Sequence, residues 1–140
     1  MSAQLKLATD IPKTRDASGD VNGKIGEHIF KTDSGKWNVH DNTIEVYLID
    51  KHEDGSVAEE VFIQFSSDVE HNKELKLQPQ RSPLAWVSFK ASNPPRVVQC
   101  IEATLFIETL SLSPFEVKGQ LRGTTDEADQ PVDISFHLKQ

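Results

Sequence analysis

Apolar and polar residues alternate along much of the chain, and this pattern predicts β-strands. Ile44, Val46 and Leu48 share one face of a first run, because successive side chains in a strand point to opposite faces. A second run covers residues 57 to 65, and the hydrophilic segment 50 to 55 between them ends in Asp-Gly, a dipeptide typical of hairpin turns. The two runs therefore predict a β-hairpin.

One residue interrupts the second run. Val61, Ile63 and Phe65 share a face, and Glu59 takes the next position on that face. A charged residue among apolar ones at this period indicates a change of register. We therefore expect either a β-bulge near residues 58 to 60 or a loop longer than the Asp-Gly turn.

The C-terminal segment predicts a second hairpin. Residues 115 to 122 and 132 to 138 alternate, and a polar connection from Thr124 to Pro131 joins them. If the apolar positions pair in register, Arg122 faces Asp133. The same register places Glu116 opposite Lys139, and opposite charges at such positions stabilise neighbouring strands.

The segment from residue 96 to 112 fits two patterns. As a strand it groups Ala103 and Leu105 on one face, and as a helix it groups Val98 with Leu112, after two prolines near the N-terminus. Valine, isoleucine and threonine are frequent here, which favours the strand.

The remaining segments extend the β pattern. Residues 25 to 30, 37 to 39, 75 to 77 and 84 to 89 predict short strands, and a turn is expected at residues 31 to 35 because of its Asp, Ser and Gly. Strands punctuated in this way predict an all-β fold, an antiparallel sandwich or barrel of about seven to nine short strands. We expect one domain at residues 25 to 140, after a flexible polar leader at residues 1 to 24.

Charge and cysteine content limit the function classes. The chain has 140 residues and a formal net charge of −7, and its 15 Lys and Arg residues are dispersed, which argues against nucleic acid as a partner. Cys100 is the single cysteine, so no intrachain disulfide forms, and its apolar surroundings indicate a small buried hydrophobe rather than a catalytic thiol. The sequence shows neither a signal peptide nor a membrane-spanning segment, so we expect a cytoplasmic protein without membrane insertion.

The acidic hairpin loop partly resembles a calcium-binding loop. Asp50 and Asp54 occupy the first and fifth ligand positions of an EF-hand loop, but His52 is an unsuitable calcium donor and Val61 stands where a bidentate Glu is required. The EF-hand is therefore excluded. A weaker hypothesis remains, a calcium site at one end of the sheets formed by Asp50, Asp54, Asp126 and Asp129.

Other candidate chemistry is weak. Asp133, Ser135 and His137 alternate on one strand, but residues two apart lie roughly 6 to 7 Å apart at their Cα atoms. A nucleophile needs a direct hydrogen bond to its base, so we interpret this segment as a polar outer strand face. The five histidines are well separated and do not form an adjacent zinc set.

Two aromatic patterns suggest ligand binding. Gly35-Lys36-Trp37 resembles the Gly-x-Trp of lipocalin-like barrels, and this resemblance implies a cavity for a small ligand inside the barrel. Trp37, Tyr47 and Trp86 alternatively form a platform on which a sugar can stack. We interpret Trp37 itself as an aromatic residue of the core or its rim.

The sequence as a whole predicts a binding or assembly module such as an inhibitor, an immunity-type protein or a structural component. We expect no enzymatic activity and no cofactor other than the calcium considered above, and the partner is another protein with a basic surface, with a homo-oligomer left open. The alternatives are a calcium- or carbohydrate-binding β-sandwich and a lipocalin-like carrier. The predicted partner-binding residues lie in the acidic loop or opposite the main apolar face: Asp50, Glu53, Asp54, Tyr47, Phe62 and Phe106.

Overall fold

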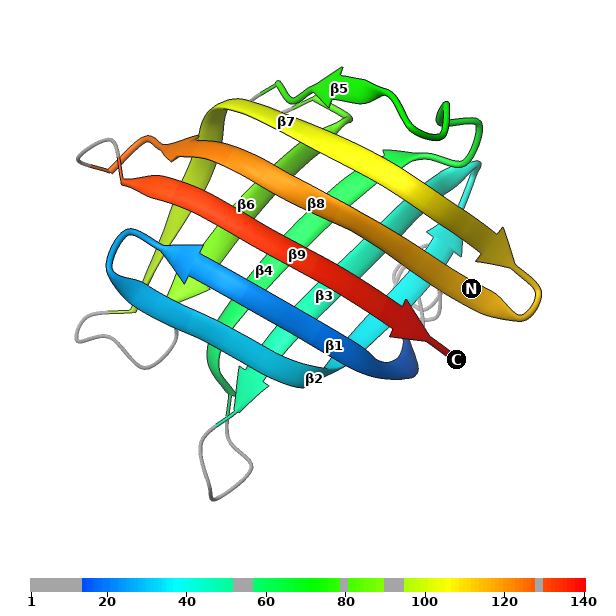
Figure 1. Ribbon diagram of the computed structural model, residues 1–140, viewed down its shortest axis with the longest axis horizontal. Coiled ribbons are helices and arrows are strands. Elements are labelled where there is room, and N and C mark those ends of the chain that lie inside the picture. Colours follow the sequence, from blue (N-terminus) through cyan, green and yellow to red (C-terminus); the bar gives the residue numbers. More distant parts are fainter. Residues whose placement is uncertain (1–13, 52–56, 79–80, 90–94, 128–129) are drawn as a thin grey trace, which may run out of the picture.

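The computed structural model describes residues 14–51, 57–78, 81–89, 95–127 and 130–140. Within these ranges the chain folds into antiparallel β-strands (Figure 1). The strands are β1 (Arg15–Ile25), β2 (His28–His40), β3 (Thr43–Lys51), β4 (Val57–Ser66), β5 (Glu74–Lys76), β6 (Leu84–Phe89), β7 (Arg96–Leu112), β8 (Phe115–Thr125) and β9 (Pro131–Lys139). The all-β prediction is confirmed.

The sheet closes on itself into a barrel. The strand order is β5-β7-β6-β4-β3-β2-β1-β9-β8, and an additional pairing joins β7 to β8. Eight strands therefore form a closed ring, and β5 is an extra strand that pairs with β7 outside it (Figure 1). Closure removes the free edges of a sheet and so satisfies the backbone hydrogen-bonding groups of the ring strands. Of the two predicted architectures, the barrel is the one observed.

The long strand β7 makes this closure possible. Its first residues, Arg96 to Gln99, pair with β6, and the stretch from Cys100 to Leu112 pairs with β8. The register shifts between Ile101 and Thr104, where Glu102 has a positive φ of 46°. The segment that fitted both a helix and a strand is therefore a strand with an irregularity that redirects it between neighbours.

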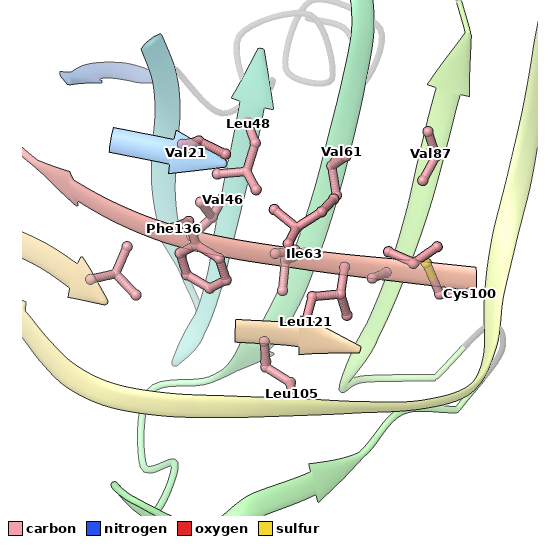
Figure 2. Close-up of a cluster of buried hydrophobic side chains, with 14 of the residues drawn as sticks. Val21, Val46, Leu48, Val61, Ile63, Val87, Cys100, Leu105, Leu121 and Phe136 are labelled. Atoms are coloured by element: carbon pink, nitrogen blue, oxygen red, sulfur yellow. The ribbon is translucent and has the colours of Figure 1, made fainter. Parts of the chain in front are cut away.

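Side chains fill the interior of the barrel. Figure 2 shows apolar groups from opposite walls converging there, among them Val46, Ile63 and Leu121, each fully buried. A barrel of about eight strands has an interior just wide enough for side chains to fill. The remaining labelled interior residues are Val21, Leu48, Val61, Val87, Cys100, Leu105 and Phe136.

Both predicted hairpins form. Arg122 pairs with Asp133 and Glu116 with Lys139, as the alternation predicted. In the first hairpin, Asp50 pairs with Glu59 whereas Lys51 pairs with Val57, so the register shifts by one residue at Ala58. The predicted β-bulge is therefore confirmed.

Three expectations are wrong. The single strand expected at residues 25 to 30 is interrupted by the β1–β2 turn at Gly26, since Ile25 ends β1 and His28 begins β2. The stretch from Arg15 to Lys24, expected to be part of a flexible leader, belongs to β1 and pairs with both β2 and β9. Residues 1 to 13 lie outside the described residues.

The turn expected at residues 31 to 35 is part of continuous strand β2. At Ser34 and Gly35 the chain is held by pairing with Ile49 and Leu48, and these ladder bonds override the local turn preference of Asp, Ser and Gly.

The two ends of the barrel differ. We call the mouth the end at which β1 turns into β2 through Gly26, β3 ends and β9 begins. At the opposite end β1 begins and β9 ends, with Ser18 paired to Lys139 (Figure 1). Within the described ranges, no helix has the length and apolar character needed to cross a membrane.

Candidate functional site

A row of three aromatic rings lies across the outer face of β3, β4 and β6. Tyr47 pairs with Phe62, and Phe62 pairs with Trp86, so the three side chains share one face of the sheet. The ring centroids of Tyr47 and Phe62 are 5.0 Å apart, and those of Phe62 and Trp86 are 4.8 Å apart with planes inclined by 22°. The neighbouring residues in each strand point into the barrel core, so we call these three residues the outer aromatic row.

The outer aromatic row combines a protected centre with accessible ends. Phe62 is only 6% exposed because it lies between the two other rings, whereas Tyr47 and Trp86 are half-buried. Val97 on β7 pairs with Ser88 on the same face of the sheet, whereas Gln99 pairs with Trp86. Val97 is 58% exposed and adds an apolar side chain to this wall. A buried aromatic centre with exposed apolar flanks is the kind of surface that interfaces use as an anchor.

Acidic groups border the row. Glu45 and Glu60 lie on the same outer face as Tyr47. Glu45 is two residues from Tyr47 along β3, and Glu60 is two residues from Phe62 along β4, opposite Ile49. Burial raises the pKa of the Tyr47 phenol above its ordinary value, and the negative charges of Glu45 and Glu60 raise it further. Asn38 donates to the Glu45 carboxylate at 3.0 Å, which fixes that charge in place. The row is thus an apolar strip beside negative charge.

A second cluster lies at the mouth. His28, Asp50 and Glu59 each offer one metal-ligating atom, and these atoms all lie within 4.8 Å of one another. The Nε2 atom of His28 is 3.3 Å from Oε2 of Glu59, whose side chain is only 13% exposed. Asp50 and Glu59 are direct cross-strand partners in the ladder between β3 and β4. We call these three residues the mouth cluster.

The structure brings together only part of the predicted calcium site. Asp50 joins the mouth cluster, and Asp126 lies in the turn between β8 and β9 at the same end of the barrel. The Asp126 carboxylate accepts a hydrogen bond from the backbone N–H of Gln99 at 3.0 Å and is not a member of the mouth cluster. Asp54 and Asp129 lie outside the described residues, so the four-aspartate hypothesis stays a prediction.

The predicted partner-binding residues fall into separate places. Tyr47 and Phe62 adjoin each other, as their shared parity indicated, whereas Phe106 lies on the outer face of β7 between Glu74 of β5 and Gln120 of β8. Glu53 and the neighbouring Asp54 are outside the described residues.

The outer face of β9 is a network of ion pairs. His137 Nε2 is 2.6 Å from a carboxylate oxygen of Glu116, and Asp133 accepts from the side-chain amide of Gln120 at 3.0 Å. Asp133 is also 3.6 Å from Arg122. These side chains therefore face partners on β8 across the strand ladder, as expected for a polar outer face.

Trp37 belongs to the core and does not join the outer aromatic row. It is 5% exposed, and its ring stacks on Phe115 with centroids 4.1 Å apart and planes inclined by 4°. The guanidinium of Arg15 lies 5.4 Å from the same ring. The interpretation of Trp37 as a core or rim aromatic is therefore confirmed, and the sugar platform would need other rings.

Comparison of the chain with protein-family models, with curated proteins and with solved structures finds no match. The fold and the sites define a small antiparallel β-barrel with a filled interior, an outer aromatic row on one wall and a His-Asp-Glu cluster at its mouth.

Proposed function

We propose that this protein is a non-enzymatic binding module that docks a protein partner on the outer aromatic row. The observation that carries this proposal is the stacking of Tyr47, Phe62 and Trp86 outside a barrel whose interior is already filled. The core does not need these rings to fill its interior, and tryptophan and tyrosine are the residues most enriched among interface anchors. The partner is a protein with a basic surface.

Charge supports this choice of partner. Glu45 and Glu60 border the row, and the chain carries a formal net charge of −7. Charges at the rim of an interface accelerate association with a surface of opposite sign and suppress binding of the wrong partner. A partner surface that is basic and has an apolar centre therefore complements both the acidic border and the aromatic side chains of the row.

The ring geometry favours a protein over a sugar. Phe62 and Trp86 are stacked on each other, and Tyr47 leans against the other side of Phe62. Sugar stacking requires a ring face open to solvent, whereas Phe62 lies between two other rings and one face of Trp86 is covered by Phe62. The filled interior likewise favours an outer docking face over a lipocalin-like ligand cavity.

Site-specific photo-crosslinking tests the proposal. A photoreactive phenylalanine at position 86 is compared with the same residue at position 120, where Gln120 lies on the outer face of β8. We expect one discrete protein adduct from position 86 in extracts of the source cell and none from position 120. Because charge contributes to binding, the yield of the adduct should fall when the salt concentration is raised from a low value to about 0.5 M. Equal crosslinking from both positions, or none from position 86, contradicts the proposal.

A matched substitution gives the energetic test once the adduct is identified. Trp86→Ala should weaken binding by about 30-fold or more, because interface anchors contribute at least about 2 kcal/mol. Gln120→Ala is the control and should leave affinity unchanged. Binding of a glycan that requires Trp86, with no protein adduct, would instead support the carbohydrate-binding alternative.

A further inference from the structure

We propose that the mouth cluster of His28, Asp50 and Glu59 binds one first-row divalent metal ion, with Zn²⁺ as the representative ion. This inference is independent of docking at the outer aromatic row, which lies on the outside of the wall. It rests on where the ladder places these side chains, on their mutual distances and on the chemistry of the three donors.

The ladder places all three residues on strand faces that line the barrel interior, at its solvent-open rim, where the His28 side chain is 42% exposed. His28 pairs with Ile25, which is 2% exposed in the core. Asp50 and Glu59 continue the faces that carry Leu48 and Val61 into the barrel, both fully buried. The three polar groups therefore point toward the barrel axis one position beyond the apolar layer, and converge there from three strands.

The pairing of the two carboxylates is unfavourable for folding alone. Asp50 and Glu59 are directly opposite in the β3–β4 ladder, where like charges destabilise adjacent strands. Glu59 is also largely removed from water, with a side chain only 13% exposed. A divalent cation between the two carboxylates offsets both negative charges. A bound metal ion therefore removes the repulsion between the Asp50 and Glu59 carboxylates.

The distances fit a small ion. Metal-to-ligand distances of about 2.0 to 2.2 Å at tetrahedral zinc place neighbouring donor atoms about 3.3 to 3.6 Å apart. The separation of 3.3 Å between His28 Nε2 and Glu59 Oε2 already meets this value. The donor atoms of the whole cluster lie within 4.8 Å, so the third ligand needs only a side-chain adjustment of about 1 Å to complete the set.

The donor types select the metal. Imidazole nitrogen with carboxylate oxygen suits zinc, cobalt, nickel or manganese, whereas calcium takes six to eight oxygen ligands and magnesium retains several waters. Three protein ligands leave a fourth position for water, so the site holds an exchangeable ligand. The cluster therefore differs from the all-aspartate calcium site that the sequence predicted.

His40 provides a matched control within the same chain. Its Nε2 atom is 3.2 Å from a carboxylate oxygen of Asp41, but both side chains are well exposed and lie in the β2–β3 turn at the other end of the barrel. This pair has a histidine and a carboxylate without the third ligand or the interior position. Adventitious zinc binding by a surface pair should therefore be affected by His40→Gln and not by His28→Gln.

Calorimetric titration of the full chain with Zn²⁺ tests the proposal. We expect one ion per chain, and a melting temperature raised by about 5 to 10 °C at 100-fold excess over the dissociation constant. Loss of an outer-shell partner of a metal costs about 10- to 100-fold in affinity. His28→Gln and Glu59→Gln, each of which removes a ligand, should therefore weaken binding by at least about 100-fold, and His40→Gln should change it less than about twofold.

Asp50→Asn separates metal binding from a purely structural role. Without metal this variant should melt at a higher temperature than the wild type, because the like-charge pair is relieved, and it should bind Zn²⁺ more weakly. Co²⁺ gives a second readout, since its absorption bands report a low-coordination nitrogen and oxygen site. Absence of stoichiometric Zn²⁺ binding, binding unchanged in His28→Gln, or a preference for Ca²⁺ over Zn²⁺ would each overturn the proposal.

Discussion

Trp37 and Phe115 stack face to face across the barrel, with ring centroids 4.1 Å apart and planes inclined by 4°. The two residues belong to β2 and β8, which are not neighbours in the sheet. The stack therefore connects two strands of the barrel that are not paired with each other by backbone hydrogen bonds. It lies at the end of the barrel opposite the mouth.

Replacing Trp37 by Ala should destabilise the barrel by about 3 to 5 kcal/mol, because it removes a buried aromatic side chain and leaves a cavity beside Phe115. Trp37→Phe keeps a ring against Phe115 and should cost clearly less. Guanidinium unfolding followed by circular dichroism measures both variants. Equal losses for the two substitutions would contradict the expectation that an aromatic ring against Phe115 stabilises the barrel.

Cys100 should be unreactive in the folded protein. It is 1% exposed, and burial together with the charge of Asp126 raises the pKa of its thiol to about 12 from an ordinary value of 9.0. The thiolate is the nucleophile, so iodoacetamide at pH 8 should label the native protein far more slowly than the protein in denaturant. Rapid native labelling would contradict the burial of Cys100.

The raised pKa of the Cys100 thiol should make the unfolding free energy decrease as pH rises in the alkaline range. Because the folded pKa is the higher one, the unfolded state loses the proton first. The stabilisation is therefore complete below about pH 9 and is lost as pH rises from there toward 12. The difference in unfolding free energy between wild type and Cys100→Ala should shrink over this window, as measured by denaturation at a series of pH values.

The pair of Glu116 and His137 should stabilise the β8–β9 hairpin in a pH-dependent manner. The hydrogen bond from His137 is the main factor that lowers the pKa of the Glu116 carboxyl, and burial opposes it as the second factor. The positive charges of Lys139 and Lys118 lower the pKa further by smaller amounts. A carboxyl with a lowered folded pKa stabilises the fold above its unfolded pKa, and this contribution disappears as pH falls through the folded pKa. The advantage of wild type over Glu116→Gln should thus be present at neutral pH and vanish in acid.

A double-mutant cycle checks the origin of that effect. If the hydrogen bond carries it, His137→Gln should produce a similar loss at neutral pH, and the double variant should lose little more than either single one. Additive losses would indicate that the two residues act separately.

Gly23 should tolerate no side chain. A Cβ atom at this position would lie 2.1 Å from the backbone oxygen of Asp133 and 2.6 Å from the Cα atom of Ile134 on β9. Gly23→Ala should force β1 away from β9 and cost about 1 to 3 kcal/mol, the usual range for overpacking. Asn22→Ala, at the exposed neighbouring position, is the control and should change the unfolding free energy by less than about 0.5 kcal/mol.

The strands with strict alternation were predictable from the sequence. The register of β8 against β9 followed from apolar positions that must all face the core, and the opposed charges of Arg122 and Asp133 agree with it. The sequence pattern did not predict strand β1, and the reason is physical. Its interior positions carry Ala17, Val21 and Ile25 with glycines between them, so the alternation is present but every second interior residue has no side chain.

The sites were predictable only in part. Tyr47 and Phe62 could be placed on one face from their parity, whereas the contact with Trp86 depends on which strand pairs with β4. His28 was missed because its neighbours in the mouth cluster are more than twenty residues away along the chain. The usable signal was its parity with Phe30, which places a histidine on the interior face at the start of β2.

The positions of the first and last ring strands have a practical consequence. Strand β1 begins beside the place where β9 finishes, at the end away from the mouth (Figure 1). A support, label or fused protein attached after Gln140 would therefore leave both the mouth cluster and the outer aromatic row facing open solution. Immobilisation through this end gives an orientation in which the proposed metal binding and the proposed partner binding can both be tested on the same sensor surface.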